Sequence, residues 1–173
     1  MNRGFLYGDG FFETIRVING TIPLMQTHED RINDAFEIYQ LEPTFLVDEE
    51  FIRSIALSYK NDGIVRINFF RDGAGKYLPL SNEVAFDHSF TEYSQPFFLP
   101  TSLDLEADLK KAPIDKGRIA IYPEPKPIAT WMTVKSLSSI YYVIAAKYKE
   151  EQGLDYLLIQ NTEGHICEEL ISN

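Results

Sequence analysis

The last third of the chain carries the pattern that most restricts its fold, an alternation of apolar, helical and apolar segments. In order, it predicts a strand at Ile128–Val134, a helix at Ser136–Gln152 ending at Gly153, a strand at Asp155–Gln160, a turn at 161–164 and a strand at His165–Ile171. This alternation is typical of an α/β unit. It places Lys135 at a strand-to-helix junction and Glu168 in the middle of a strand.

The preceding residues predict another α/β unit. The pair Asn19-Gly20, between two apolar runs, is a strong signal for a two-residue hairpin. A helix is expected to begin near Thr27, which forms a capping-box pattern with Asp30. Its inward side chains would be Ile32, Phe36 and Tyr39. The other predicted elements are a helix at 48–59 and strands at Ile64–Phe70, Asn82–Phe86 and Arg118–Tyr122.

We therefore expect an α/β (α+β) chain with two domains. A small N-terminal domain is expected at residues 1–105, a charged connection at 106–116, and the first part of a larger domain at 117–173.

Composition narrows the functional classes. The 26 acidic and 16 basic residues give a net charge of −10, which disfavours a nucleic-acid backbone or an anionic membrane surface as partner. The single cysteine, Cys167, excludes an internal disulfide and suits a reducing, cytoplasmic location. No apolar run is long enough to span a bilayer, and the N-terminus lacks a signal-peptide pattern. The three histidines lie far apart, so no metal site is expected.

Four stretches, in their order along the chain, resemble one known family. They are RGFLYGDGFFETIRV at 3–17, HEDRI at 28–32, IVRINFFRDGAGKYLP at 64–79 and, after Lys135, GHICEELISN at 164–173. Together they resemble the fold-type-IV pyridoxal-phosphate enzymes, also called class IV aminotransferases. That family includes branched-chain and D-amino-acid aminotransferases and 4-amino-4-deoxychorismate lyase. The resemblance covers nearly the whole chain.

The resemblance implies pyridoxal 5'-phosphate as the cofactor and assigns three residues to it. Lys135 would form the internal aldimine with the cofactor aldehyde and later move the proton at the substrate carbon. Glu168, rather than Glu169, would lie beside the pyridine nitrogen and keep it protonated, so that the ring accepts electrons. Arg31 would bind the phosphate, because a guanidinium is planar, permanently charged and bidentate.

The resemblance also assigns residues to the substrate. Arg66 and Lys76 would approach the substrate carboxylate, and Tyr7 would lie near the active site. Thr14 matches the position of a threonine that assists catalysis in the lyases. Each residue also has a simpler interpretation, as a solvated lysine, a core tyrosine or a solvent-facing strand residue. The occurrence of all four stretches in family order favours the functional interpretation.

Three functions remain open. The first is a class IV aminotransferase that passes an amino group between an amino acid and a 2-oxo acid. The second is an aminodeoxychorismate lyase giving 4-aminobenzoate and pyruvate, favoured by Thr14 and by Ile140 where branched-chain members tend to have tyrosine. The third is a cofactor-free dimerising or binding module. In the resembling family the cofactor lies between two domains at a homodimer interface, and members continue beyond the position of Asn173, so a truncated large domain is expected.

Overall fold

The computed structural model describes residues 2–93 and 117–171, and the chain divides into two compact units. The first consists of Met1–Tyr93 and Ile128–Ile140, and the second of Ser94–Pro127 and Tyr141–Asn173. The expected connection at 106–116 lies outside the described residues. The segment that contains Lys135 groups with the first unit, whereas the sequence placed it in the second domain.

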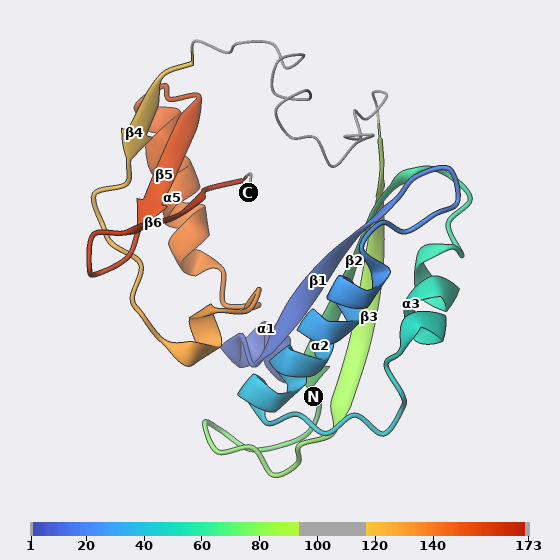
Figure 1. Cartoon of the computed structure of the whole chain (residues 1–173). Helices are drawn as coiled ribbons and strands as arrows, with labels where there is room; N and C mark the ends of the chain where they lie inside the picture. Colours follow the sequence, from blue (N-terminus) through green and yellow to red (C-terminus); the bar gives the residue numbers. More distant parts are fainter. Residues whose placement is uncertain (1, 94–116, 172–173) are drawn as a thin grey trace. The chain divides into compact units, whose positions relative to one another are not determined.

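The first unit is built on an antiparallel sheet of three strands. Its order is β1 (Gly10–Val17), β2 (Gly63–Arg71) and β3 (Val84–Glu92), with α2 (Met25–Tyr39) and α3 (Glu49–Ala56) beside it (Figure 1). Alternate side chains of the strands point to the helices. The buried core includes Phe11, Ile15, Ile32, Phe36, Ile52, Ile67 and Phe69. Within residues 2–93, the predicted helices and strands are confirmed. The inward positions of Ile32 and Phe36 are confirmed, and Tyr39 is partly buried against the same core.

The hairpin signal at Asn19-Gly20 is also confirmed. Both residues have positive φ, 49° and 69°, as a two-residue turn with this twist requires. Ile18 and Thr21 exchange backbone hydrogen bonds across the turn, each of 2.9 Å. The strand that precedes the turn pairs with β2 over its whole length, so the hairpin itself stays short.

The structure adds one helix near the N-terminus and moves the start of another. Residues Arg3–Tyr7 form a short helix, α1, because the Asn2 side chain caps the Phe5 amide and Gly8 ends the turn with φ of 67°. Helix α2 begins at Met25, before the predicted cap at Thr27, and has no side-chain cap. The Asp30 carboxylate instead accepts a hydrogen bond of 2.9 Å from Gln26, one turn earlier in the helix.

The segment before and after Lys135 differs from the expected strand and helix start. Within 128–134, residues Thr130–Met132 form a 3-10 helix, η1, in which the Thr133 hydroxyl and amide both donate to the Thr130 carbonyl. The predicted strand at Ile128–Val134 is therefore wrong. Helix α5 (Ile140–Glu151) begins four residues later than expected. Serines explain the delay, since the Ser136 hydroxyl accepts from the Ser138 amide and competes with helical bonding.

The second unit is a smaller sheet with one helix. Strand β4 (Ile119–Ile121) runs parallel to β5 (Tyr156–Gln160), and β5 pairs antiparallel with β6 (Ile166–Glu169). Helix α5 lies against this sheet (Figure 1) and ends near Gly153, which has φ of 58°. The core consists of Tyr122, Ala145, Leu157 and Ile159. These elements confirm the predicted strands and the helix stop, and they place Glu168 within β6.

No helix in residues 2–93 or 117–171 has the length and apolar character needed to cross a membrane.

Candidate active site

Lys135 lies on the outer edge of strand β1. Its carbonyl accepts a hydrogen bond of 2.8 Å from the Phe12 amide, and the Leu137 amide donates to the Gly10 carbonyl at 3.0 Å. A side chain at Gly10 would collide with the Phe69 carbonyl and with Leu137, so the close approach requires glycine. The Nζ of Lys135 is 5.9 Å from the centroid of the Phe12 ring. Backbone pairing to β1, rather than a strand-to-helix junction, therefore fixes the position of this lysine.

Arg31 and Lys135 line the same pocket, which has a volume of about 250 Å³. The walls come from β1, from α2 and from residues 133–135. The Arg31 side chain is 44% exposed, and its Nη2 lies 3.2 Å from the carboxylate of Glu13. That carboxylate is only 4% exposed and also contacts the Nδ1 of His28, at 2.7 Å. The pocket thus combines an amine with a guanidinium held by a buried carboxylate.

The sheet face opposite the helices carries Thr14 and Arg66, which are direct partners in the β1–β2 register. The Arg66 guanidinium carbon lies 3.5 Å from the centroid of the Phe12 ring, and its Nε donates to Asn68 at 2.8 Å. Burial lowers the pKa of Arg66, and the nearby carboxylate of Asp87 opposes the shift. The cations of Arg66 and Lys135 therefore both neighbour one aromatic ring.

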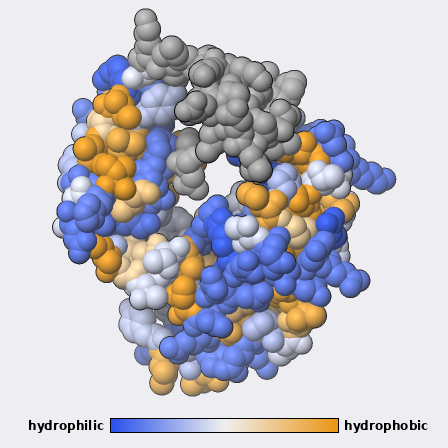
Figure 2. Space-filling view, in the orientation of Figure 1, coloured by the Kyte–Doolittle hydropathy of each residue, from blue (hydrophilic) through white to orange (hydrophobic). Residues whose placement is uncertain are grey.

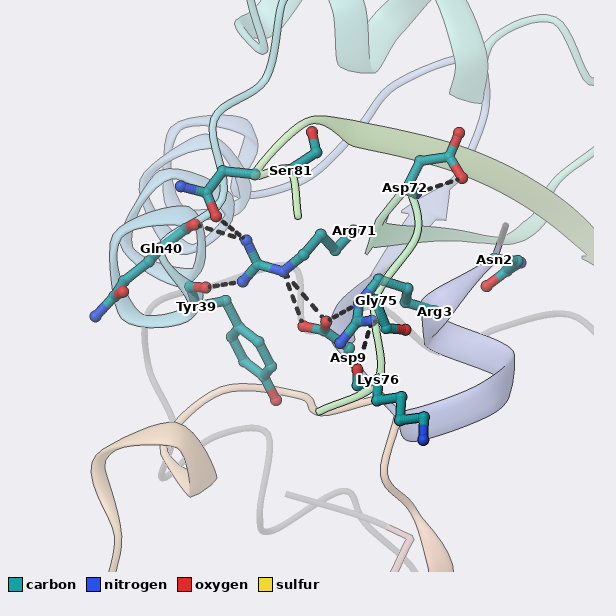
Figure 3. A network of polar contacts seen from close by, with 12 residues as sticks. Asn2, Arg3, Asp9, Tyr39, Gln40, Arg71, Asp72, Gly75, Lys76 and Ser81 are labelled. Carbon is teal, nitrogen blue, oxygen red and sulfur yellow. Dashed lines mark hydrogen bonds and ion pairs between the residues drawn. The ribbon is translucent and has the colours of Figure 1, made fainter. Parts of the chain in front are cut away.

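Tyr7 and Lys76 lie together at the loop that follows β2. The Tyr7 ring is 5.8 Å from the ring of Tyr77, and the Arg3 guanidinium lies 4.7 Å from the centroid of the Tyr7 ring. Arg3 Nη1 donates to the carbonyls of Gly75 and Lys76, at 3.0 and 2.7 Å (Figure 3). It is the Lys76 backbone, not its amine, that this network holds.

The loop is tied to the rest of the unit by a buried ionic network. Asp9 accepts from Arg3 Nε at 2.8 Å and from Arg71 Nε at 3.1 Å (Figure 3). Arg71 also donates to the carbonyls of Tyr39 and Gln40 at the end of α2. The Asp9 carboxylate therefore links α1 to β2, while Arg3 extends the network to the loop and Arg71 extends it to α2.

Glu168 is held within the second unit by two side chains. Its Oε1 accepts from Lys126 Nζ at 2.9 Å and from the Tyr142 hydroxyl at 2.8 Å. Burial acts to lower the pKa of Lys126, but its contacts with Tyr142 and Glu168 outweigh it and raise that pKa overall. Glu169, by contrast, accepts from the backbone amides of Leu157 and Ile171. Lys126 and Tyr142 thus bind the same oxygen of Glu168.

Sequence reasoning missed four residues that support these groups: Glu13, His28, Lys126 and Tyr142. Each supporting contact joins residues on different segments of the chain. For Lys126 the sequence offered one signal, the flanking prolines Pro125 and Pro127, because prolines restrict the backbone on both sides of the lysine.

Comparisons with known proteins identify the family of this chain and its fold. Residues 10–173 match the model of the family described as amino-transferase class IV. A curated relative, the aminodeoxychorismate lyase of Bacillus subtilis (strain 168), is 27% identical over an alignment 179 residues long, which covers 99% of this chain and 56% of the relative. The chain therefore spans little more than half the length of that relative.

Solved structures share the fold. A branched-chain aminotransferase from the archaeon Thermoproteus uzoniensis matches with a TM-score of 0.72 at 16% identity, over 98% of this chain and 56% of that one. A Brucella abortus aminotransferase bound to the cofactor pyridoxal phosphate matches with a TM-score of 0.72 at 18% identity, over 99% and 59%. The fold is that of the pyridoxal-phosphate enzymes of fold type IV. The chain belongs to the class IV aminotransferase family, which confirms the predicted family, fold class and family cofactor.

The residues of the first unit fit such a cofactor. An amine suits an aldehyde, and a guanidinium with a partly exposed side chain suits a phosphate; Lys135 and Arg31 bring both to one pocket. The carboxylate assigned to the ring nitrogen lies in the second unit.

Proposed function

We propose that this protein performs pyridoxal-phosphate-dependent chemistry at Lys135, as an aminotransferase that passes an amino group between an amino acid and a 2-oxo acid. The observation that carries the proposal is the pocket shared by Lys135 and Arg31. When bound, the cofactor supplies an electron-accepting ring for the bond broken at the substrate carbon.

Each candidate site residue has a defined role in this proposal. The Lys135 amine holds the cofactor and moves the proton at the substrate carbon. Arg31 binds the phosphate, and Glu168 keeps the ring nitrogen protonated while Lys126 and Tyr142 hold its other oxygen. The substrate carboxylate is met by basic side chains and a hydroxyl, namely Arg66, Lys76 and Tyr7.

The second candidate is the lyase that forms 4-aminobenzoate and pyruvate from 4-amino-4-deoxychorismate. It is favoured by Thr14, which stands opposite Arg66 on the open face of the sheet, and by the similarity to the Bacillus subtilis lyase. The same lysine would serve both reactions, so the cofactor site alone does not distinguish them.

A substrate panel separates the two candidates. The protein with pyridoxal phosphate is given 4-amino-4-deoxychorismate in one arm, with pyruvate release measured, and glutamate or a branched-chain amino acid with a 2-oxo acid in the other. We expect amino-group transfer; pyruvate release without transfer would replace the aminotransferase with the lyase.

The variant Thr14→Val tests the lyase assignment, because it keeps the shape of the side chain and removes the hydroxyl. If the lyase assignment is correct, this change should lower pyruvate release by about 10²-fold or more, a typical contribution of a positioned proton donor, whereas a transaminase should be little affected.

A homodimer is part of the proposal. Large apolar side chains are exposed on α1 and on the loop after β2, where Phe5 is 87% and Tyr77 is 91% exposed, and Leu78 and Leu80 lie beside Tyr77 in the loop. Figure 2 shows hydrophobic residues at the surface in the region of this loop. Exposed apolar groups of this kind mark interfaces.

Light scattering after gel filtration should give twice the chain mass. The double variant Tyr77→Ser, Leu78→Ser should shift the measured mass towards that of the monomer. A monomeric parent protein would contradict the dimer. The cytoplasmic location stays a prediction.

A further inference from the structure

Glu13 is a buried carboxylate whose two oxygens face two side chains of one helix. It lies on β1 between the core residues Phe11 and Ile15 and is 3% exposed. Its Oε1 contacts His28 Nδ1 at 2.7 Å, and its Oε2 contacts Arg31 Nη2 at 3.2 Å. His28 and Arg31 are three residues apart on α2 and so project from the same face. We propose that Glu13 is a positioning residue that fixes the Arg31 guanidinium for a phosphate ester in the pocket lined by Lys135.

The location of Glu13 argues for this role. A carboxylate among core side chains loses its hydration, so it is retained only with good partners. His28 takes one oxygen, which leaves the other to orient the arginine. Arg31 has five N–H donors, its ion pair with Glu13 engages a single nitrogen, and its side chain is 44% exposed. The other N–H groups of the guanidinium can therefore bind an anion in the pocket that Arg31 lines.

Two effects of Glu13 on an anion oppose each other. Its negative charge repels a phosphate, while its contact with Arg31 removes rotamer freedom that binding would otherwise have to restrict. Fixing one long side chain in advance improves affinity by about two- to tenfold. The repulsion is weakened because both carboxylate oxygens already face donors, and because the phosphate would contact the guanidinium rather than the carboxylate. The positioning effect is therefore expected to be the larger.

The inference rests on the proposed function, since it assumes that Arg31 binds the cofactor phosphate. The test compares dissociation constants for pyridoxal phosphate and for pyridoxal, which lacks the phosphate, in the parent protein, Glu13→Gln, Arg31→Ala and the double variant. We expect Glu13→Gln to weaken pyridoxal phosphate by about two- to tenfold and to leave pyridoxal unchanged. The loss should vanish in the Arg31→Ala background, because a residue acting through Arg31 has nothing left to position.

Each other outcome overturns the inference. Unchanged or tighter pyridoxal phosphate binding by Glu13→Gln would mean that repulsion dominates or that the contact has no role. Equal weakening of pyridoxal would mean a purely structural role. If Arg31→Ala itself leaves pyridoxal phosphate affinity unchanged, the phosphate role in the proposed function fails as well. If Arg31→Ala weakens binding and Glu13→Gln does not, only the positioning role fails.

Two further variants make the test robust. Glu13→Asp keeps the charge but withdraws the carboxylate by one methylene, so it should also weaken pyridoxal phosphate selectively even if Glu13→Gln does not fold. Glu49→Gln is the matched control, because Glu49 pairs with Arg53, whose side chain is 45% exposed, on a different helix. That control should leave both dissociation constants unchanged.

Discussion

Lys135→Ala is expected to abolish the visible absorption band that the protein develops with pyridoxal phosphate and to lower turnover by at least about 10²–10⁴-fold. In the proposed reaction the amine both attaches the cofactor and moves the proton, and the described residues that line the pocket include no second lysine. The measurement is an absorption spectrum of the parent and the variant with added cofactor, followed by the rate with the better substrate.

The control for this prediction is Lys147→Ala, an exposed lysine on α5 that should leave the band intact. A band that persists in Lys135→Ala would move the attachment to another lysine and refute the assignment. The absence of a band in both the parent and the variant would instead favour the cofactor-free binding module. Both results leave the family assignment unchanged, because it rests on the sequence match.

Asp9→Asn is expected to lower the free energy of unfolding by about 3–5 kcal/mol, the usual cost of removing one partner from a buried ion pair. Arg3 and Arg71 are 2% and 6% exposed, and both contact this carboxylate. The amide keeps the shape of the side chain but leaves two buried guanidinium groups without their shared counter-charge. Urea unfolding monitored by circular dichroism measures the change.

Asp30→Asn serves as the control, because Asp30 sits on a solvent-facing part of α2 and makes a single exposed hydrogen bond. Its effect should stay within about 0.5 kcal/mol. A loss below about 1 kcal/mol for Asp9→Asn, a typical value for a single hydrogen bond, would show that the surrounding carbonyls suffice for the two arginines. Gly75, Lys76, Tyr39 and Gln40 provide those carbonyls.

Elements whose signals are local could be predicted from the sequence. The turn at Asn19-Gly20, the Asp48-capped helix α3 and the strands of both sheets follow from residues that lie next to one another. The position of residues 135–137 could not, because it is set by hydrogen bonds to β1, more than a hundred residues earlier. Apolar and β-branched content alone predicted a strand at Ile128–Val134, although the threonines close a local turn.

The candidate site divides in the same way. Lys135, Glu168 and Arg31 were found through motifs that stand in the sequence, and the structure brings Lys135 and Arg31 to one pocket. Glu13 and Lys126 were missed because their roles depend on ion pairs with residues on other elements, Arg31 and Glu168. A buried acid inside the apolar alternation of β1 was the single available clue to Glu13. Packing against α2, which the sequence does not encode locally, gives that acid its partners.

The pairing of residues 135–137 with β1 has a consequence for the behaviour of the sheet. Strand β1 stands at the edge of the order β1-β2-β3, where unpaired backbone groups could recruit a strand from another molecule. The Phe12 amide and the Gly10 carbonyl instead form hydrogen bonds with Lys135 and Leu137. Residues 135–137 therefore also cover part of the exposed edge of the sheet. Substitutions that loosen this segment are expected to promote aggregation as well as to displace Lys135.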